Sequence, residues 1–479
     1  MNMRISNIDD TIAAVATPIG ESGIGIVRLS GKEALAVADK IFVSKGGQKP
    51  SSFKTYTTHY GWVVENRSAD ERLAIPACRQ AGSDKQIDEV ILTVMRAPRS
   101  YTKEDIVEIN CHGGIVAMRA ILDLVLDNGA RLAEPGEFTK RAFLNGRIDL
   151  AQAEAVLDII RAKTDAALKI GTTQLKGALS HQINNVSESL LEVLSILEAN
   201  IDFPEEEISA VNLKQITEKL TKVNDVLKNI LENAGRGRII REGIHVVICG
   251  KPNAGKSSTL NALLGQERSI VTAVAGTTRD TIEEVIDIKG IPIRIVDTAG
   301  ILEPRDLVEK KAVERSKRFI DLADLIILLF DGSRRLSGED ELLIAKLKKK
   351  TVIAVINKAD LEQKIERNRI FKKFNCVVEI SAKKNRNINL LEEEIAGKIY
   401  KGEVPVTDSI LISKLRHITI VKEAQKLIAQ ARDSLDNKVS VEFAAQDIKD
   451  ALSHLDEISG KKFCEDLLDR IFNDFCIGK

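Results

Sequence analysis

One short stretch of the chain, residues Gly250–Ser257, has the residue types and spacing of a loop that binds phosphate groups. It fits the pattern G-x-x-x-x-G-K-[ST], in which glycines let the backbone curl until its N–H groups point at phosphate oxygens. Lys256 can reach the outer phosphates, and the Ser257 hydroxyl can hold Mg²⁺. The apolar run Ile244–Cys249 predicts a buried strand before the loop, and Ser258–Leu264 predicts a helix after it. This order of strand, loop and helix predicts nucleotide binding.

Three further motifs follow apolar runs later in the chain. In Asp297–Gly300, the carboxylate can hold Mg²⁺ through water and the last N–H can bond the γ-phosphate. Asn357–Asp360 ends in a carboxylate that suits the N1–H and 2-amino group of guanine, a donor pair that adenine lacks. Ser381–Lys383 is expected to support the base. Four motifs in this order and spacing resemble a Ras-like GTPase domain.

The segment 272–280 lies where Ras-like GTPases carry a threonine that closes over Mg²⁺ and the γ-phosphate. We assign this role to Thr278, with Thr277 as the alternative. Ras-like enzymes then use a glutamine to position the attacking water, but this chain has Ile301, which cannot orient water. Glu309 could act through a second water, and its alternative interpretation is a solvated helix residue.

Asn253 lies inside the phosphate loop, where a neutral amide oxygen suits a monovalent cation. Together with switch carbonyls it could hold K⁺ where other GTPases place an arginine finger. Taken without any family resemblance, an ordinary polar loop residue is the favoured interpretation of Asn253. The residues expected to contact GTP are Asn253, Ala254, Gly255, Lys256, Ser257, Ser258, Thr272, Ala273, Val274, Ala275, Gly276, Thr277, Thr278, Asp297, Thr298, Ala299, Gly300, Asn357, Lys358, Ala359, Asp360, Ser381, Ala382 and Lys383.

The regions that must position these residues differ in their hydrophobic pattern along the chain. Residues 1–145 mix short β-type runs with turns and predict an α+β domain. Residues 146–240 and 403–479 have helical periodicity, with a basic, glycine-containing linker expected over 235–243. Residues 241–402 alternate strand and helix, which predicts a mostly parallel sheet with helices on both faces. We therefore expect an α/β domain inserted into a discontinuous helical domain, although two separate bundles would have the same texture.

Composition narrows the class of protein. The chain has 479 residues, 44% of them hydrophobic, and its 70 basic and 70 acidic residues cancel, so any contact with nucleic acid should be local. The longest aliphatic or aromatic run, Leu325–Phe330, is too short for a bilayer, and we expect no membrane association. Six scattered cysteines predict neither a disulfide framework nor a zinc site, which favours a reducing, cytoplasmic location.

The two ends of the chain resemble the MnmE family, also called TrmE, of tRNA modification GTPases. The matching motifs are Asp10–Pro18, Gly23–Gly31, Ser100–Asp105, Asn110–Gly114, Pro135–Arg147 and the terminal Phe475–Lys479. The resemblance covers nearly the whole chain. It implies an N-terminal domain that binds tetrahydrofolate and dimerises, a discontinuous helical domain and an inserted Ras-like GTPase domain.

The resemblance also implies an activity. Family members are K⁺-activated GTPases that act as homodimers with a flavoprotein partner, MnmG, which brings FAD and NADH. Together they add an aminomethyl or carboxymethylaminomethyl group to carbon 5 of the wobble uridine in certain tRNAs. The one-carbon unit comes from a tetrahydrofolate derivative, in its 5-formyl or 5,10-methylene form.

Several site residues carry over from the resemblance alone. It gives Glu309 and Cys476 catalytic roles, although a lone cysteine near a chain end is equally an incidental residue. The expected K⁺ ligands are Asn253, Thr272, Val274 and Thr277; the Mg²⁺ ligands are Ser257 and Thr278; the folate-contacting residues are Arg28, Glu108, Arg147 and Lys479.

Three other polar or thiol side chains have simpler interpretations. Cys249 is expected in the core of the strand before the phosphate loop. Cys111 and His112 precede a Gly-Gly turn, and we interpret His112 as a hydrogen-bonded turn residue rather than a catalytic base.

Two alternative functions stay open. A ribosome-assembly GTPase would share the Asn253 loop and the Gly276–Arg279 switch, but it would not need Arg28, Glu108 or the C-terminal Cys-Ile-Gly-Lys. A membrane-remodelling GTPase would need a basic amphipathic segment, and no such stretch appears.

Overall fold

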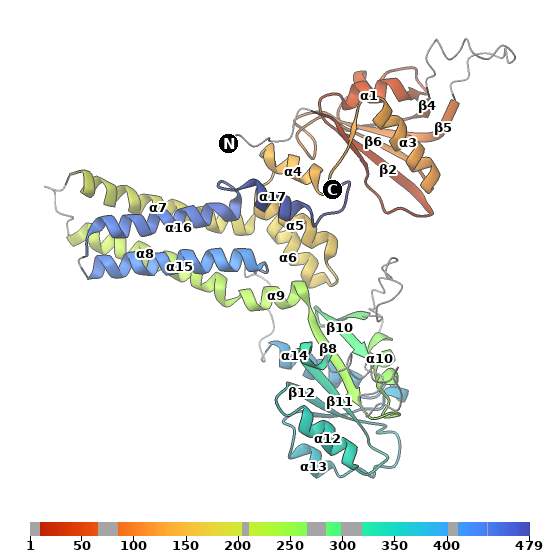
Figure 1. The fold of residues 1–479 in the computed structure, drawn as a ribbon, viewed down its shortest axis with the longest axis vertical. Coiled ribbons are helices and arrows are strands. Elements are labelled where there is room, and N and C mark those ends of the chain that lie inside the picture. Colours follow the sequence, from red (N-terminus) through yellow and green to blue (C-terminus); the bar gives the residue numbers. More distant parts are fainter. Residues whose placement is uncertain are drawn as a thin grey trace. The chain divides into compact units, whose positions relative to one another are not determined.

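A computed structural model describes residues 10–65, 85–203, 210–265, 284–297, 319–400, 411–437 and 439–479. The chain divides into two compact units. The first unit consists of residues 1–157 and 456–479, and the second of residues 158–455 (Figure 1). Each unit has its own hydrophobic core.

The described part of the first unit contains a seven-stranded sheet in the order β3-β4-β5-β6-β2-β1-β7. All neighbours are antiparallel except β1 and β7, which run parallel. Because residues opposite each other in adjacent strands share a face, this order aligns the middle of β2 with the middle of β6. The strands are β1 (Ile12–Val15), β2 (Ser22–Ser30), β3 (Phe42–Ser44), β4 (Thr57–Glu65), β5 (Lys85–Met95), β6 (Ile106–Gly113) and β7 (Arg131–Leu132).

Apolar side chains from alternate strand positions form the core of this unit with two helices. Val27, Leu92 and Ile109 from the strands pack with Ile41 and Ile121 from α1 and α3. A second cluster, which includes Phe143, Leu150 and Phe472, joins the C-terminal helix to the N-terminal segment. The chain's last residues are therefore part of the N-terminal unit. The helical elements are α1 (Ala34–Ile41), η1 (Pro50–Ser52), α3 (Ile115–Asp127), α4 (Glu137–Leu144), α5 (Leu150–Arg161) and α17 (Glu465–Phe472).

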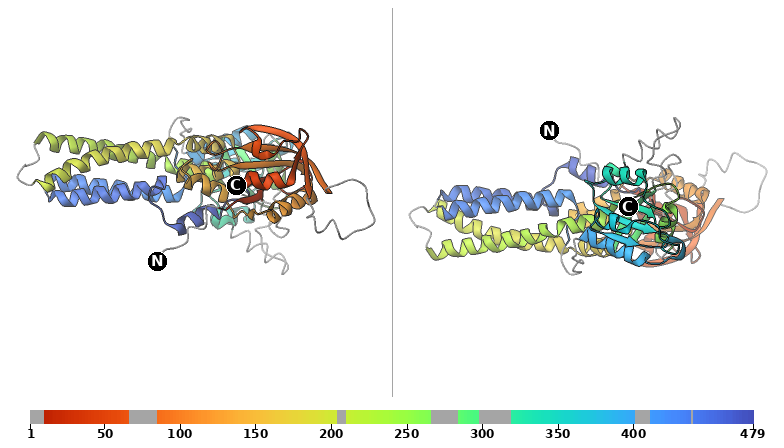
Figure 2. Two further views of the ribbon diagram at one scale, coloured as in Figure 1. Left: turned by 90° about the horizontal axis from the view of Figure 1, so that it is seen from above. Right: turned by 90° about the horizontal axis from the view of Figure 1, so that it is seen from below.

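Long helices form a bundle in which segments from before and after the nucleotide domain run side by side (Figure 2). The apolar residues that recur at helical spacing in α8 between Ile216 and Ile230 are buried, as the helical periodicity of residues 146–240 predicts. Helix α7 ends at Asp202. Leu191 falls at helical spacing with the buried leucines of α7, which predicts burial, but its side chain is 51% exposed. The helices are α6 (Asp165–Leu175), α7 (Ala178–Asp202), α8 (Ala210–Glu232), α9 (Ala234–Glu242), α15 (Leu415–Asp436) and α16 (Val441–Ser459).

The prediction of a linker over residues 235–243 was wrong, because Ala234–Glu242 form helix α9. Gly237 serves close packing rather than flexibility: a β-carbon there would lie 2.4 Å from the carbonyl oxygen of Ile412. Near the end of α9, Arg241 donates to Asp158 at 2.9 Å, and Lys414 meets the other oxygen of that carboxylate at 3.3 Å. Asp158 thus joins the segment that enters the nucleotide domain to the segment that leaves it.

The nucleotide domain is built on a sheet in which the described strands follow the order β13-β12-β11-β8-β10-β9. Only β9 runs antiparallel among them, so the prediction of a mostly parallel sheet is confirmed. The strands are β8 (Ile244–Gly250), β9 (Glu284–Ile288), β10 (Ile291–Asp297), β11 (Leu325–Asp331), β12 (Val352–Asn357) and β13 (Val377–Glu379). The helical elements are α10 (Lys256–Leu264), α12 (Gly338–Lys346), α13 (Arg367–Phe371), η2 (Ala382–Lys384) and α14 (Ile388–Tyr400).

Helices cover both faces of this sheet. Ile248 of β8 packs with Leu263 of α10 and Leu391 of α14 on one face. On the other face, the neighbouring Val247 packs with Leu343 of α12. Because both faces are buried, the strands read in sequence as continuous apolar runs. The fold class predicted from the sequence is confirmed.

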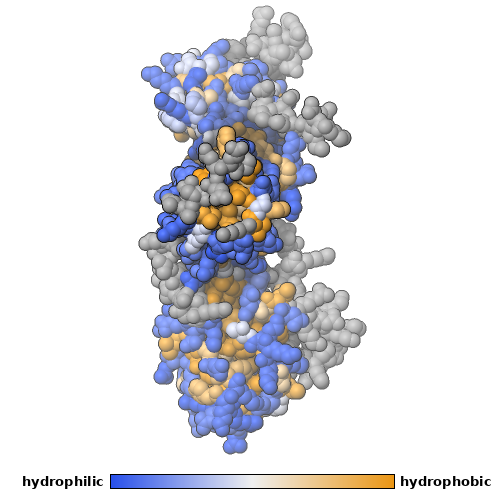
Figure 3. All heavy atoms as spheres, turned by 90° about the vertical axis from the view of Figure 1, so that its left-hand side faces the viewer, coloured by the Kyte–Doolittle hydropathy of each residue, from blue (hydrophilic) through white to orange (hydrophobic). Residues whose placement is uncertain are grey.

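The end of the bundle where α7 stops and α16 begins carries exposed apolar side chains. Phe203 is 67% exposed and Phe443 is 65% exposed. Figure 3 views the molecule from the side on which this end of the bundle lies, and hydrophobic residues gather there among hydrophilic ones. Among the described residues, none of the helices is both long enough and apolar enough to cross a membrane.

Candidate functional site

The phosphate loop follows β8 and leads directly into α10, as the sequence predicts. Three residues of the loop have positive φ: Gly250 at 152°, Asn253 at 63° and Gly255 at 99°. These dihedrals curl the chain so that α10 begins at Lys256, and a helix N-terminus attracts anions. The side chains of Asn253 and Ser257 are exposed at the loop surface.

Asn357 at the end of β12 locks the phosphate loop to the base-recognition segments. Its side-chain N–H donates to the carbonyl of Ala254 at 3.0 Å, and its side-chain oxygen accepts from the N–H of Ala382 at 3.1 Å. A β-carbon on Gly255 would lie 2.1 Å from the Asn357 amide nitrogen, so this position requires glycine. The motifs at 250–257, 357–360 and 381–383 therefore form one assembly at the carboxyl edge of the sheet.

Lys256 places its ammonium group against the loop itself. It donates to the carbonyl oxygens of Gly250 at 3.1 Å and Lys251 at 3.0 Å. These carbonyls hold the ammonium beside the curled backbone, where the sequence predicts the outer phosphates. Ser258 is exposed on the first turn of α10.

The residues that the sequence predicts to recognise the base are ordered by hydrogen bonds. The Ser381 hydroxyl donates to Asp360 Oδ1 at 2.6 Å, and this bond lowers the pKa of the Asp360 carboxyl below its usual range. The backbone N–H of Ala359 donates to the carbonyl of Ile380 at 2.9 Å. Ser381 is fully buried, whereas Asp360 and Lys383 are exposed. A carboxylate held ionised at the surface can accept two N–H donors from one edge of a base.

Part of the predicted site lies outside the described residues. Asp297 ends β10 in register with Ile248 of β8, which places its backbone at the same carboxyl edge of the sheet. The other predicted residues of the switch and of water activation are not described: Thr272, Ala273, Val274, Ala275, Gly276, Thr277, Thr278, Thr298, Ala299, Gly300, Ile301 and Glu309.

A second group of predicted residues meets in the first unit. Arg28 of β2 and Glu108 of β6 are register partners, and the Arg28 Nε donates to Glu108 Oε1 at 2.7 Å. Arg28 also donates to the carbonyl of Gly478 at 3.2 Å. Their side chains are 18% and 19% exposed, so the pair is sheltered yet reachable from solvent. The structure therefore brings the chain's C-terminus to the Arg28–Glu108 pair.

The C-terminal tail is fixed by close backbone contacts. Gly478 has a φ of 91°, and a β-carbon there would lie 2.3 Å from the carbonyl oxygen of Val15. The carbonyl of Cys476 accepts from the N–H groups of Gly136 at 3.4 Å and Lys479 at 3.3 Å. The Cys476 side chain is exposed. The tail thus holds a cysteine and the terminal residues beside the end of β1.

Arg147 borders this group through aromatic rings. Its guanidinium lies 4.8 Å from the ring centre of Tyr101, and the guanidinium of Arg28 lies 5.7 Å from that of Phe138. Tyr101 packs against the cluster that contains Phe138. Both cations therefore lie on one apolar patch, a favourable arrangement for guanidinium groups. Within the described part of the chain, no hydrogen bond or ion pair joins Arg147 to Glu108 or Lys479.

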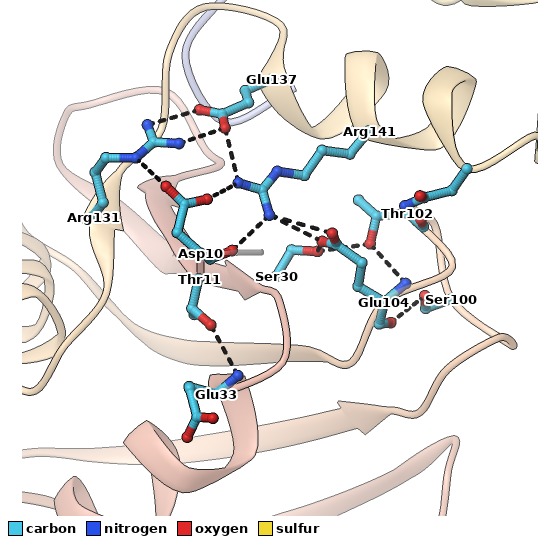
Figure 4. A network of polar contacts seen from close by, with 11 residues as sticks. Asp10, Thr11, Ser30, Glu33, Ser100, Thr102, Glu104, Arg131, Glu137 and Arg141 are labelled. Atoms are coloured by element: carbon cyan, nitrogen blue, oxygen red, sulfur yellow. Dashed lines mark hydrogen bonds and ion pairs between the residues drawn. The ribbon is translucent and has the colours of Figure 1, made fainter. Parts of the chain in front are cut away.

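Sequence reasoning missed a buried ionic network next to this group (Figure 4). Arg141, with a side chain only 3% exposed, contacts Asp10 at 2.5 Å, Glu137 at 3.0 Å and Glu104 at 3.3 Å. Arg131 joins the same network through Asp10 at 2.8 Å and Glu137 at 2.7 Å. All of these residues except Arg131 lie in motifs that carry the family resemblance. The only sequence signal was their presence in those motifs, because no local spacing predicts which charges pair.

The network controls the ionisation of its members. Burial alone would raise the pKa of Glu137, but hydrogen bonds from Arg131 and Arg141 and from the backbone outweigh it, and the pKa is lowered. The pKa of Asp10 is lowered for the same reasons. Asp10 and Glu137 therefore stay charged at neutral pH and form ion pairs with the two arginines rather than act as proton donors.

His112 is hydrogen-bonded, as predicted, but it lies in strand β6 rather than in a turn. Its Nδ1 lies 2.7 Å from Asp88 Oδ1, a partner on β5 that sequence spacing could not identify. Cys111 is buried, and burial raises the pKa of its thiol to about 11, which suits a core residue and not a nucleophile. Cys249 is also buried, as predicted.

The donor chemistry of the loop fits the expected cations. Within the described residues, no group of three or more His, Cys, Asp or Glu side chains could hold a metal ion. The loop instead presents a hydroxyl on Ser257 and an amide on Asn253, both exposed. Such neutral oxygens suit Mg²⁺ that is bound mainly by phosphates and water, and they suit a monovalent cation.

Comparisons with known proteins cover nearly the whole chain. A sequence model described as the MnmE helical domain matches residues 150–476, and one described as the GTP-binding protein TrmE N-terminus matches residues 11–147. The chain is 45% identical over 474 residues to the tRNA modification GTPase MnmE of Clostridioides difficile, which covers 98% of this chain and 100% of that protein. It is 44% identical over 473 residues to the tRNA modification GTPase MnmE of Bacillus subtilis, with the same coverage. Among solved structures, Aquifex aeolicus Era bound to GDP and AlF4⁻ is 34% identical, covering 38% of this chain and 66% of that chain, with a TM-score of 0.28.

Proposed function

This chain belongs to the MnmE family of tRNA modification GTPases, and we propose that it hydrolyses GTP in order to modify the wobble uridine of certain tRNAs. The observation that carries the GTPase part is the Asn357 side chain, which joins the phosphate loop to the base-recognition segments. A site that holds phosphates and a guanine edge at once has the parts that GTP binding requires. The proposal extends to the partner, the folate and the cations, which rest on the family and on the chemistry of the residues.

The residues of the proposed GTP site have separate roles. Lys256 carries the charge for the outer phosphates, and the loop N–H groups supply further donors. Asp360 accepts from the guanine edge, and Ser381 keeps its carboxylate oriented. Ser257 and Thr278 would hold Mg²⁺, which neutralises charge on the phosphates when bound, with Asp297 acting through water.

K⁺ dependence is a separate part of the proposal. Asn253 is exposed in the phosphate loop and has a positive φ of 63°. With Thr272, Val274 and Thr277 it would hold K⁺, which supplies positive charge to the phosphates when bound. Because Ile301 cannot orient water, Glu309 would do so through a second water. Equal GTPase rates in Na⁺ and K⁺ buffers would contradict the K⁺ site, and wild-type hydrolysis by Glu309→Ala would contradict the role of Glu309.

The folate site is proposed at the Arg28–Glu108 pair. These two side chains satisfy each other at 2.7 Å, so a ligand must offer donors to the carboxylate and acceptors to the guanidinium to compete. A pterin ring and its glutamate tail offer both. Arg147 and Lys479 would supply further positive charge, and the exposed thiol of Cys476 lies on the same tail as Lys479.

Assembly completes the proposal. We propose a cytoplasmic homodimer formed through the N-terminal domain, acting with tRNA and the FAD- and NADH-dependent partner MnmG. We also propose the four-part organisation of residues 1–145, 146–240, 241–402 and 403–479. The contacts of the tail with Arg28 favour this reading over a ribosome-assembly switch, which would have no use for them.

Reconstitution tests the function directly. The full-length protein is mixed with the flavoprotein, GTP, Mg²⁺, K⁺, methylene-tetrahydrofolate and unmodified tRNA, and the nucleosides are identified by mass. We expect a uridine modified at carbon 5, and we expect Arg28→Gln to abolish it while GTP hydrolysis continues. Arg119→Gln, on a side chain 81% exposed, is the matched control and should modify tRNA normally. Unmodified uridine together with no folate binding would contradict the modification reading and leave the assembly switch.

A further inference from the structure

Asp331 ends β11, outside the motifs that predicted the nucleotide site. We propose that Asp331 is a positioning residue for guanine nucleotides, because its carboxylate holds the side chain of Lys358 in the base-recognition loop. The inference rests on the proposed GTP binding and deepens it by adding a residue that sets how long the nucleotide stays bound.

Both oxygens of Asp331 are engaged in directed contacts. Oδ2 accepts from the ammonium of Lys358 at 2.6 Å. Oδ1 accepts from the backbone N–H of Ser333 at 3.0 Å and from its hydroxyl at 2.6 Å. The Asp331 side chain is 14% exposed and that of Lys358 is 29% exposed, so water screens the pair only in part. Ser333 thus fixes the orientation of the carboxylate that receives Lys358.

Lys358 is a residue that needs to be held. Its φ is 63°, a left-handed conformation that a residue with a β-carbon rarely adopts unless its surroundings impose it. Its carbonyl accepts from the side-chain N–H of Gln363 at 2.9 Å, which fixes the backbone. The contact with Asp331 fixes the other end, the ammonium, and therefore orders the flexible four-carbon stem between them.

The neighbours of Lys358 in the loop are each secured in a comparable way. Asn357 is bonded to the phosphate loop, and Asp360 is bonded to Ser381. In the parallel pair of β11 and β12, Asp331 lies opposite Asn357. Lys358 is the residue that directly follows Asn357, so it lies one position beyond Asp331. This offset lets an aspartate reach the lysine ammonium from the strand end. The side chains of the guanine-recognition loop are therefore held in place before the nucleotide binds. This lowers the entropy cost of ordering the loop on binding.

A lower entropy cost of binding should appear as a slower dissociation of the nucleotide. Without the Asp331 carboxylate, Lys358 would sample other rotamers in the empty and the bound states. We expect Asp331→Asn to release a fluorescent GDP analogue about tenfold faster than the wild type. Single-turnover hydrolysis of GTP at saturating protein should stay within about twofold, because Asp331 does not lie on the phosphate loop.

A matched control lies at the opposite end of the same strand. Asp324 precedes β11 and accepts from the N–H of His245 at 2.9 Å, at the edge of the sheet away from the nucleotide. Asp324→Asn should leave the release rate within about twofold even where it lowers the unfolding temperature. Equal acceleration by both variants would show that Asp331 acts through the stability of the sheet and would overturn the proposal.

The Lys358 variant separates a direct effect from one that passes through Lys358. In a Lys358→Met background, adding Asp331→Asn should accelerate release by less than twofold, because the side chain that it positions is gone. A full tenfold effect in that background would overturn the proposal. If Asp331→Asn does not fold, Ser333→Ala replaces it, and we expect about a threefold faster release.

The outcome also distinguishes this inference from the proposed function. Failure of the wild type to bind the GDP analogue would contradict GTP binding itself. Wild-type binding with unchanged release from Asp331→Asn would overturn only the role of Asp331.

Discussion

Replacing Arg141 with methionine should destabilise the N-terminal unit strongly. The Arg141 side chain is 3% exposed, and its guanidinium lies 2.5 to 3.3 Å from three carboxylates, those of Asp10, Glu104 and Glu137. Methionine keeps much of the stem volume but removes the charge, so Arg131 is left as the cation that the network shares. The substitution therefore isolates the ionic contribution from the packing contribution.

The magnitude follows from the burial of the network. Removing one partner of a buried ion pair costs about 3–5 kcal/mol, because the other partner stays buried without compensation. Asp10 is 34% exposed and can recover some hydration, so we expect the lower end, about 3 kcal/mol. With a urea m-value of about 2 kcal/mol/M, the midpoint of unfolding should fall by about 1.5 M.

The chain contains a built-in probe for this measurement. Its one tryptophan, Trp62, lies in β4 of the N-terminal unit, so tryptophan fluorescence follows the unfolding of that unit. The matched control is Arg119→Met, because Arg119 is 81% exposed and meets Asp123 only at 3.6 Å. Exposed pairs of this kind contribute little, and the control should shift the free energy of unfolding by less than about 0.5 kcal/mol.

The pH dependence gives a second test with a defined sign. The pKa values of Asp10 and Glu137 are lowered below their usual 3.8 and 4.5. The stability that they contribute is therefore fully present above those usual values and is lost as pH falls through the lowered ones. In Arg141→Met the pKa values of these carboxyls rise, so they take up protons between pH 7 and pH 4. The difference in the free energy of unfolding between wild type and variant should therefore become smaller over this pH range. A midpoint within about 0.3 M of wild type at pH 7, or a difference of equal size at both pH values, would refute the reasoning.

Three further predictions concern the second unit. Ser381→Ala should weaken GTP binding about fivefold, because it removes the 2.6 Å hydrogen bond that orients Asp360 and lowers the pKa of its carboxyl; titration of a fluorescent nucleotide at pH 7 measures the loss. Asp158→Asn should accelerate hydrogen exchange in the segments that enter and leave the nucleotide domain, because Lys414 and the cation on α9 lose their shared carboxylate; unchanged protection there would contradict this role. Gly255→Ala should abolish nucleotide binding, because its β-carbon would lie 2.1 Å from a buried amide nitrogen, and equilibrium dialysis against GDP measures the loss.

The nucleotide domain could be predicted almost entirely from local sequence. The central parallel strands β8, β11 and β12 are buried on both faces, so a run such as Leu325–Phe330 identifies a strand without knowledge of its neighbours. Its motifs follow those strands directly, and parallel strands end at one edge, so order along the chain translates into proximity in space. The contact of Asn357 with Ala254 is a consequence of that rule.

The N-terminal site could not be predicted in the same way. Arg28 and Glu108 pair across antiparallel strands, and Gly478 reaches them from the other end of the chain. Periodicity predicts strands, but it does not predict which strands become neighbours, so these contacts entered the sequence analysis only through the family resemblance. The same limit explains why the partner of His112 on β5 was missed, and why a glycine-rich segment was interpreted as a linker when Gly237 serves close packing.

The ionic network changes how the N-terminal motifs should be interpreted. Asp10, Glu104, Glu137 and Arg141 lie in the motifs that identified the family, yet they pair with one another and are largely withdrawn from solvent. A charge whose hydrogen bonds are satisfied inside the protein contributes to the shape of a site rather than to its chemistry. The polar side chains that can meet a ligand are then those that the network leaves at the surface, and Cys476 is exposed on a tail whose backbone is fixed. If this division is correct, Arg141→Met should lose folate binding and stability together, whereas Cys476→Ser should lose modification of tRNA while folate binding and the urea midpoint stay at wild-type values. Loss of stability in Cys476→Ser would contradict it, because it would make the thiol part of the scaffold.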